Sequence, residues 1–88
     1  MQIIFDHEKN KQNLAKHGLS FELVGECDWS APVILQDERK DYSEIRYNAF
    51  VIFRNRLHNV VFTNRDGDMR VISFRKANLR ERKKYEKI

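Results

Sequence analysis

The chain contains very little cysteine, proline and glycine, and this scarcity excludes several classes of site. Its 88 residues include one cysteine, one proline and three glycines. Cys27 alone cannot form an internal disulfide, and it has no spacing for a zinc site. There is no glycine-rich phosphate loop, no nucleophile elbow and no dinucleotide-binding fingerprint.

Long apolar runs are also missing. The longest falls far short of the ~20 residues that a membrane span needs. The N-terminal stretch "MQIIFDHEKN" lacks the basic start and the apolar segment of a signal peptide. We therefore expect a cytoplasmic protein without a membrane partner.

Charge is abundant and unevenly distributed. Charged residues make up 34% of the chain and hydrophobic residues 41%, which fits one small globular domain over residues 1–88. Residues 1–44 hold five Lys/Arg and nine Asp/Glu, a net charge of −4, whereas residues 45–88 hold twelve and four, a net charge of +8. This split indicates that one side of the molecule meets a polyanion, although a solvated basic surface would show the same composition.

The first third of the chain predicts a short strand and two helices. Ile3–Phe5 fits an edge strand, and Asp6 fits the N-cap of a helix that runs to about Lys16. Gly18 can close that helix in the left-handed conformation, and Ser20 can cap a second one.

The rest of the chain alternates between apolar and polar residues, which predicts strands. We expect strands at residues 45–53, 57–63 and 69–74, and a further strand at Val33–Gln36. Asn55-Arg56 and Asp66-Gly67 are the predicted hairpin loops. The fold class is therefore α+β: a compact single domain in which N-terminal helices and a C-terminal helix pack on an antiparallel β-meander.

The turns also predict which residues face each other. The main core face should carry Tyr47, Ala49, Val51, Phe53, Val60, Phe62 and Val71. The opposite face should carry Phe50, Ile52, Leu57, Val61, Ile72 and Phe74, so we expect a helix or a partner to cover part of it. The expected cross-strand pairs are Arg65 with Asp68, Thr63 with Arg70, His58 with Arg75, and Arg46 with Arg65.

This register gathers cationic side chains. Arg46, Arg65 and Arg70 should lie near the Asp-Gly hairpin on one face, and His58 and Arg75 on the other. Arginine can hold two phosphate oxygens, and histidine exchanges a proton near neutral pH. RNA cleavage without a metal needs both functions. Alternatively, these arginines form ordinary surface ion pairs with the acids Glu44, Asp66, Asp68 or Glu81.

Three further residues each have two interpretations. His17 is either a catalytic or RNA-contacting group or a plain C-terminal cap of its helix. Glu81 is either a general base or, with the N-cap Asn78, the capping-box residue of the last helix. Tyr85 either stacks on a base or anchors that helix to the sheet.

The chain resembles the BrnT family of bacterial type II toxins over nearly its whole length. "DHEKNKQNLAKHGLSFE" is similar to the N-terminal signature of the family through Lys9, Asn13, Lys16, His17, Gly18 and Phe21. The C-terminal half is similar through Thr63, Arg65, Arg70, Ile72, Ser73, Arg75, Ala77, Glu81 and Tyr85. The chain departs from the family pattern at Phe74, where a small residue usually precedes the arginine.

The resemblance implies a RelE-like fold and a ribonuclease toxin that cleaves RNA without a metal or other cofactor, inhibits translation and arrests growth. A BrnA-like antitoxin would neutralise it, and operator DNA would be bound only through the antitoxin complex. The candidate catalytic residues are Arg65, Arg70, Arg75, His17 and Glu81. The candidate RNA-binding residues are Lys16, Arg46, His58, Lys76, Arg80 and Tyr85. A non-catalytic nucleic-acid-binding module and a protein-interaction module are the alternatives.

Overall fold

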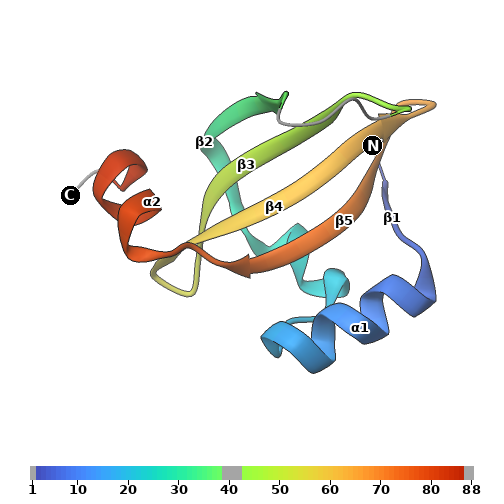
Figure 1. Cartoon of the computed structure of the whole chain (residues 1–88), viewed down its shortest axis with the longest axis horizontal. Coiled ribbons are helices and arrows are strands. Elements are labelled where there is room, and N and C mark those ends of the chain that lie inside the picture. The colour runs from blue at the N-terminus through green and yellow to red at the C-terminus, as the bar shows by residue number, and fades with distance from the viewer. Residues whose placement is uncertain (1, 39–42, 87–88) are drawn as a thin grey trace.

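The fold is a five-stranded sheet with helices at both ends of the chain, in a computed structural model that describes residues 2–38 and 43–86 (Figure 1). The strand order in the sheet is β1-β5-β4-β3-β2. In chain order the elements are β1 (Ile3–Ile4), α1 (His7–His17), the 3₁₀ helix η1 (Phe21–Glu26), β2 (Asp28–Asp37), β3 (Arg46–Phe53), β4 (Arg56–Arg65), β5 (Asp68–Lys76) and α2 (Leu79–Tyr85).

Local capping signals set the bounds of the N-terminal helices. The Asp6 side chain accepts a hydrogen bond from the Lys9 N–H (3.3 Å), as predicted for an N-cap. Gly18 adopts φ 72° and ends α1 in the left-handed conformation. Ser20 caps the next element, which is a 3₁₀ helix of six residues. The capping predictions are therefore confirmed.

The sheet is an antiparallel meander from β2 to β5, with β1 added in parallel at the β5 edge. The predicted edge strand is thus confirmed. β2 is longer than the predicted Val33–Gln36, and its pairing with β3 is irregular between Asp28 and Val33. Pro32 lies in that irregular stretch, and an edge strand tolerates a residue without an N–H.

The loop between β3 and β4 differs from the prediction by one residue. The positive-φ pair is Arg54 (51°) and Asn55 (62°) rather than Asn55-Arg56. Tyr47 consequently pairs with Phe62, so the predicted pairing of Arg46 with Arg65 is wrong. Moving the loop by one residue shifts the register by two, which leaves every side chain of β3 and β4 on its predicted face.

The pairing of β4 with β5 contains a β-bulge at Ile72. Arg65 faces Asp68 and Thr63 faces Arg70, as predicted, but Phe62 pairs with Val71 while Val61 pairs with Ser73. Ile72 is therefore an extra residue in β5.

The bulge reverses the face of every residue that follows it in β5. The predicted pair His58 with Arg75 is wrong, because Asn59 faces Arg75 and His58 faces Lys76. Arg75 thus lies on the same face of the sheet as Arg70. Phe74, predicted for that face, turns into the main core and is fully buried.

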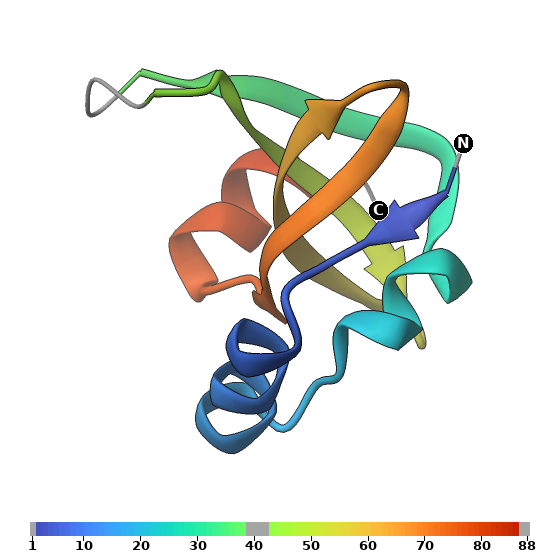
Figure 2. The ribbon, with the colours of Figure 1, turned by 90° about the vertical axis from the view of Figure 1, so that its right-hand side faces the viewer.

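Each face of the sheet packs against a different part of the chain. Figure 2 shows η1 and α2 on opposite sides of the sheet. A smaller cluster of Phe50, Leu57 and Ala77 lies under α2 and packs against Tyr85, so the predicted partial cover of this face is confirmed. The main core consists of Leu19, Phe21, Val24, Cys27, Ala49, Val51, Phe53, Val60, Phe62, Met69, Val71 and Phe74.

His58 belongs to the main core side. It is 3% exposed, its ring lies 5.2 Å from that of Phe53, and Nδ1 bonds to the Arg56 carbonyl oxygen (2.9 Å). Burial lowers the pKa of His58 below its ordinary value, helped by the charges of Arg56 and Lys76 and opposed by that hydrogen bond.

Candidate functional site

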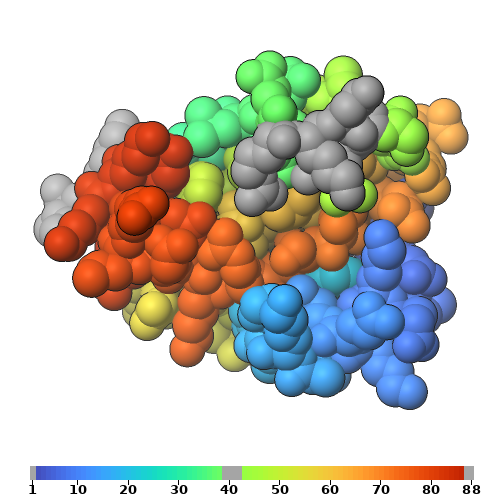
Figure 3. Space-filling model, viewed as in Figure 1, coloured from blue at the N-terminus to red at the C-terminus, as the bar shows by residue number. Residues whose placement is uncertain are grey.

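A groove of about 540 Å³ lies on the face of the sheet that α2 partly covers. Figure 3 shows the surface of this face, with α2 at one end of the strands and α1 along the β5 side. The groove is lined by Leu35, Gln36, Asp37 and Glu38, by Arg46, Asn48 and Phe50 of β3, by Asn59 and Val61 of β4, by Ile72, Ser73 and Arg75 of β5, and by Arg80, Glu81, Lys84 and Tyr85 of α2.

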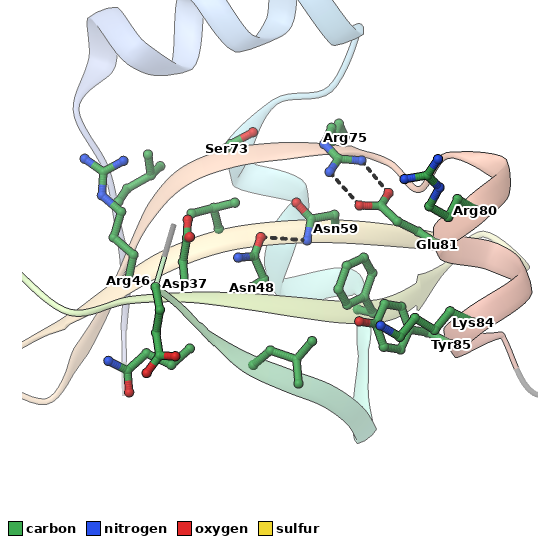
Figure 4. Close-up of a pocket in the computed structure, with 16 residues that line it drawn as sticks. Asp37, Arg46, Asn48, Asn59, Ser73, Arg75, Arg80, Glu81, Lys84 and Tyr85 are labelled. Carbon is green, nitrogen blue, oxygen red and sulfur yellow. Dashed lines mark hydrogen bonds and ion pairs between the residues drawn. The ribbon is translucent and has the colours of Figure 1, made fainter. Parts of the chain in front are cut away.

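Arg75 is held in place by Glu81. Its Nη1 and Nη2 atoms donate to the two carboxylate oxygens at 2.8 and 2.9 Å, and Nη1 also donates to the Lys76 carbonyl oxygen at 3.1 Å (Figure 4). The Nε–H and the second Nη2–H donate to no group in the described part of the chain. These two hydrogens point in parallel, so one edge of the guanidinium remains open for a phosphate or carboxylate.

Glu81 has a structural role at the same time. It accepts a hydrogen bond from the Asn78 N–H (2.9 Å), while the Asn78 side chain accepts one from the Glu81 N–H (2.8 Å). The predicted capping box is therefore confirmed. The hydrogen bonds from Arg75 lower the pKa of Glu81 below its ordinary value, which makes this carboxylate a weaker base.

A second hollow of about 260 Å³ adjoins the groove, because Ile72 and Ser73 line both. Its other lining residues come from α1: Lys9, Gln12, Asn13, Lys16 and His17. Burial, together with the positive charges of Lys16 and Arg75, lowers the pKa of His17 below 6.5. His17 is therefore mostly neutral at pH 7 and can accept a proton.

A third hollow, of about 150 Å³, adjoins the groove at Arg46 and Ile72. It is also lined by Arg70, Thr63, Glu44 and Ser43. The hydrogen bond from Arg65 and the charge of Arg70 lower the pKa of Glu44 below its ordinary value. The three hollows meet at the bulge residue Ile72, so the bulge lies at the centre of one continuous cationic surface.

The structure brings most of the predicted site residues together. Five of them line the main groove, namely Arg46, Arg75, Arg80, Glu81 and Tyr85. His17, Lys16 and Arg70 line the adjoining hollows.

Three predicted site residues line none of these hollows. Arg65 is 45% exposed and forms an ion pair with Glu44 at the hairpin. Lys76 is exposed and lies opposite His58 in the strand register. His58 is buried in the core, where a bound RNA could not reach it.

Asn13 is one of the residues that carry the family resemblance, and the structure shows what its side chain does. It is 7% exposed, and its Nδ2 donates to the Phe74 and Leu19 carbonyl oxygens at 2.8 and 2.9 Å. Its Oδ1 accepts a hydrogen bond from the Phe74 N–H at 3.2 Å. One amide thus joins the C-terminal end of α1, where His17 lies, to the strand residue next to Arg75.

Asn48 and Asn59 in the groove floor were also missed. Their signal was an asparagine in each of two largely apolar strands, "YNAFVIF" and "LHNVVF". Among residues 2–38 and 43–86, no group of three or more His, Cys, Asp or Glu side chains could hold a metal ion. No helix in those ranges is long and apolar enough to cross a membrane.

Known proteins resemble the chain in both sequence and fold. Residues 5–81 match the model of a family described as "Ribonuclease toxin, BrnT, of type II toxin-antitoxin system". The chain belongs to the BrnT family. The match includes the groove residues from Leu35 to Glu81, whereas Lys84 and Tyr85 lie beyond it.

The BrnT fold is also matched by a solved structure. The 1.1 Å crystal structure of the Brucella abortus ribonuclease toxin BrnT has a TM-score of 0.71 and 30% sequence identity to the chain. The alignment covers 89% of this chain and 97% of that one. No curated protein matches the chain significantly.

We predict that Asn13→Ala destabilises the protein by about 2–5 kcal/mol, because buried backbone groups of Phe74 and Leu19 lose their partners. Urea unfolding followed by circular dichroism measures this. Lys11→Ala, an exposed substitution in the same helix, is the control and should change the free energy of unfolding by less than about 0.5 kcal/mol. A loss below about 1 kcal/mol in Asn13→Ala would contradict the bridging role.

Proposed function

We propose that this BrnT-family chain is an endoribonuclease that cleaves single-stranded RNA in the groove over β3, β4 and β5. The open Nε–Nη2 edge of Arg75 is the observation that carries the proposal. Arg75 lines a groove that also holds Arg46, Arg80 and Lys84. Guanidinium forks bind phosphate oxygens in pairs, and a cationic groove attracts a polyanionic strand.

The proposed reaction uses the 2′-hydroxyl of the RNA. The 2′ oxygen attacks the adjacent phosphorus, its proton passes to a base, and the bond from phosphorus to the 5′ oxygen breaks. The products are a 2′,3′-cyclic phosphate and a 5′-hydroxyl, whose proton comes from solvent. Arg75 stabilises the additional negative charge on the phosphorane; Arg80 lines the same groove, and Arg70 lines an adjoining hollow.

His17 suits the role of base better than Glu81 does. A neutral imidazole can take up a proton, and the lowered pKa keeps His17 neutral at pH 7. Glu81 is held by Arg75 and by the Asn78 N–H, and its pKa is lowered. Its role in this proposal is to orient Arg75. The side chains named here supply both functions, so cleavage is proposed to proceed without a metal ion.

Membership of a type II toxin–antitoxin family implies an antitoxin partner. We propose that this partner is a BrnA-like protein and that the chain contacts operator DNA only through their complex. Cleavage of cellular RNA in the cytoplasm would inhibit translation and growth. A relation of the fold to RelE-type ribonucleases, which the sequence resemblance implies, is part of the same proposal.

Arg75→Ala should reduce RNA cleavage at least about 100-fold, because charge stabilisation in a transition state is worth several kcal/mol. The matched control is Arg65→Ala, since Arg65 also pairs with a glutamate but lies outside the groove. The control should keep its rate within about threefold. Cleavage of a fluorescent oligonucleotide in the presence of EDTA measures both. Equal losses in the two variants would contradict the site, and EDTA-sensitive cleavage would contradict the metal-free reaction.

The cleavage rate should rise with pH through a midpoint below 6.5 and then level off. Only neutral His17 accepts the proton, and its lowered pKa moves the loss of activity to more acidic pH. A pH–rate profile of kcat/KM measures this, and His17→Ala should be slower and lack that step. A variant that keeps the step would show that another group is the base.

A further inference from the structure

We infer that the Ser73 hydroxyl is a further catalytic group, which donates a hydrogen bond to a non-bridging oxygen of the scissile phosphate. The inference rests on the proposed cleavage of RNA and adds one donor between the phosphate-binding arginine and the base. Ser73 is one of the residues that carry the family resemblance. The reaction proposed for Arg75 and His17 leaves its hydroxyl without a role.

Ser73 lies where the two parts of the proposed site meet. The groove that holds Arg75 and the hollow that holds His17 share two lining residues, Ile72 and Ser73. Of these two, only Ser73 has a side chain that can donate a hydrogen bond. A phosphate bound between Arg75 and His17 therefore lies beside this hydroxyl. Figure 4 shows Ser73 next to Arg75 along β5.

The bulge gives Ser73 the same orientation as Arg75. After Ile72 the ladder is regular again, with Ser73 opposite Val61 and Arg75 opposite Asn59. Residues two positions apart in a strand have side chains on the same face and lie about 6.5 Å apart along it. A short serine and a long arginine at this spacing can reach the same phosphate group.

The Ser73 hydroxyl is available to a ligand. The residue is half-buried, and its Oγ forms no hydrogen bond with any group in residues 2–38 and 43–86. Other serines of the chain use their hydroxyls to support the fold. Ser20 Oγ accepts a hydrogen bond from the Glu22 N–H, and Ser30 Oγ donates one to the Asp28 carboxylate. Ser73 has no such structural contact among the described residues.

The position of the hydroxyl is fixed relative to both partners. The Asn13 side chain bonds to the N–H and the carbonyl oxygen of Phe74, the residue between Ser73 and Arg75. Asn13 belongs to α1, as His17 does, so this contact holds the helix of the base against the strand of the two donors. A donor that is already in place costs no reorganisation during the reaction.

The chemistry of the step calls for such a donor. Attack by the 2′ oxygen adds negative charge to the non-bridging oxygens of the phosphate. The open edge of Arg75 stabilises part of this charge, and Ser73 donates to the oxygen on the side of the His17 hollow. The Ser73 hydroxyl keeps its own proton, because His17 accepts the proton of the 2′-hydroxyl. A hydrogen bond that strengthens as the charge grows raises kcat more than it tightens binding.

The test compares three variants with the wild type by cleavage of a fluorescent oligonucleotide. Ser73→Ala should lower kcat at least about tenfold and change KM by less than about threefold. Ser73→Thr keeps a hydroxyl and should retain at least about a third of the wild-type kcat. The matched control is Ser30→Ala, which removes a hydroxyl outside both hollows and should leave the rate within about threefold. Thermal unfolding shows that each variant is folded.

Two outcomes would overturn the role of Ser73 while the proposed cleavage stands. The first is a Ser73→Ala protein with the wild-type kcat, and the second is a Ser73→Thr protein as slow as Ser73→Ala. Cleavage of a 2′-O-methyl RNA by the wild type would show a nucleophile other than the 2′ oxygen, which would also overturn the donor role. A wild type that cleaves no RNA would contradict the proposed function and this inference together.

Discussion

The cationic surface depends on one extra residue in a strand. Because Ile72 has no partner in β4, the residues after it in β5 exchange faces. Phe74 fills the main core, and Arg75 joins Arg70 and Arg46 on the open face. A regular ladder would have pointed Phe74 into the groove and Arg75 into the core. The bulge thus decides both the packing of the core and the composition of the groove, and the three hollows that meet at Ile72 all depend on it.

Two polar contacts hold this arrangement. The Asn13 amide bonds to both backbone groups of Phe74 beyond the short β1 strand, where the β5 edge has no neighbouring strand among the described residues. This contact fixes α1 beside the bulge and brings His17 near Arg75. Glu81 takes one edge of the Arg75 guanidinium and caps α2 with the same carboxylate. The ion pair with Glu81 therefore orients the Arg75 guanidinium. It leaves the Nε–H and one Nη2–H of Arg75 available to a ligand.

Local signals were readable from the sequence, whereas the geometry of the site was not. Asp6, Gly18, Ser20, Asn78 and the Asp66-Gly67 turn act over a few residues, and all of them were predicted correctly. The loop at Arg54-Asn55 was missed by one residue, because an arginine at positive φ has no clear sequence signal. The bulge was missed because it arises from the pairing of two strands, and its consequences are the misplaced Phe74 and Arg75 and the wrong pairing of His58 with Arg75. Asn13 and Asn59 were visible as polar residues, but only the packing shows which backbone or groove positions they serve.

The most direct test of this account is a crystal structure of the protein with a 2′-O-methyl RNA pentamer. We expect a phosphate on the Nε–Nη2 edge of Arg75, within about 3 Å of both nitrogens. Glu81 should remain on the other edge, and the scissile position should lie between Arg75 and His17. RNA bound on the opposite face, or along the exposed Arg65 and Lys76 side chains with the Arg75 edge left open, would contradict the central claim that the bulge builds the catalytic groove.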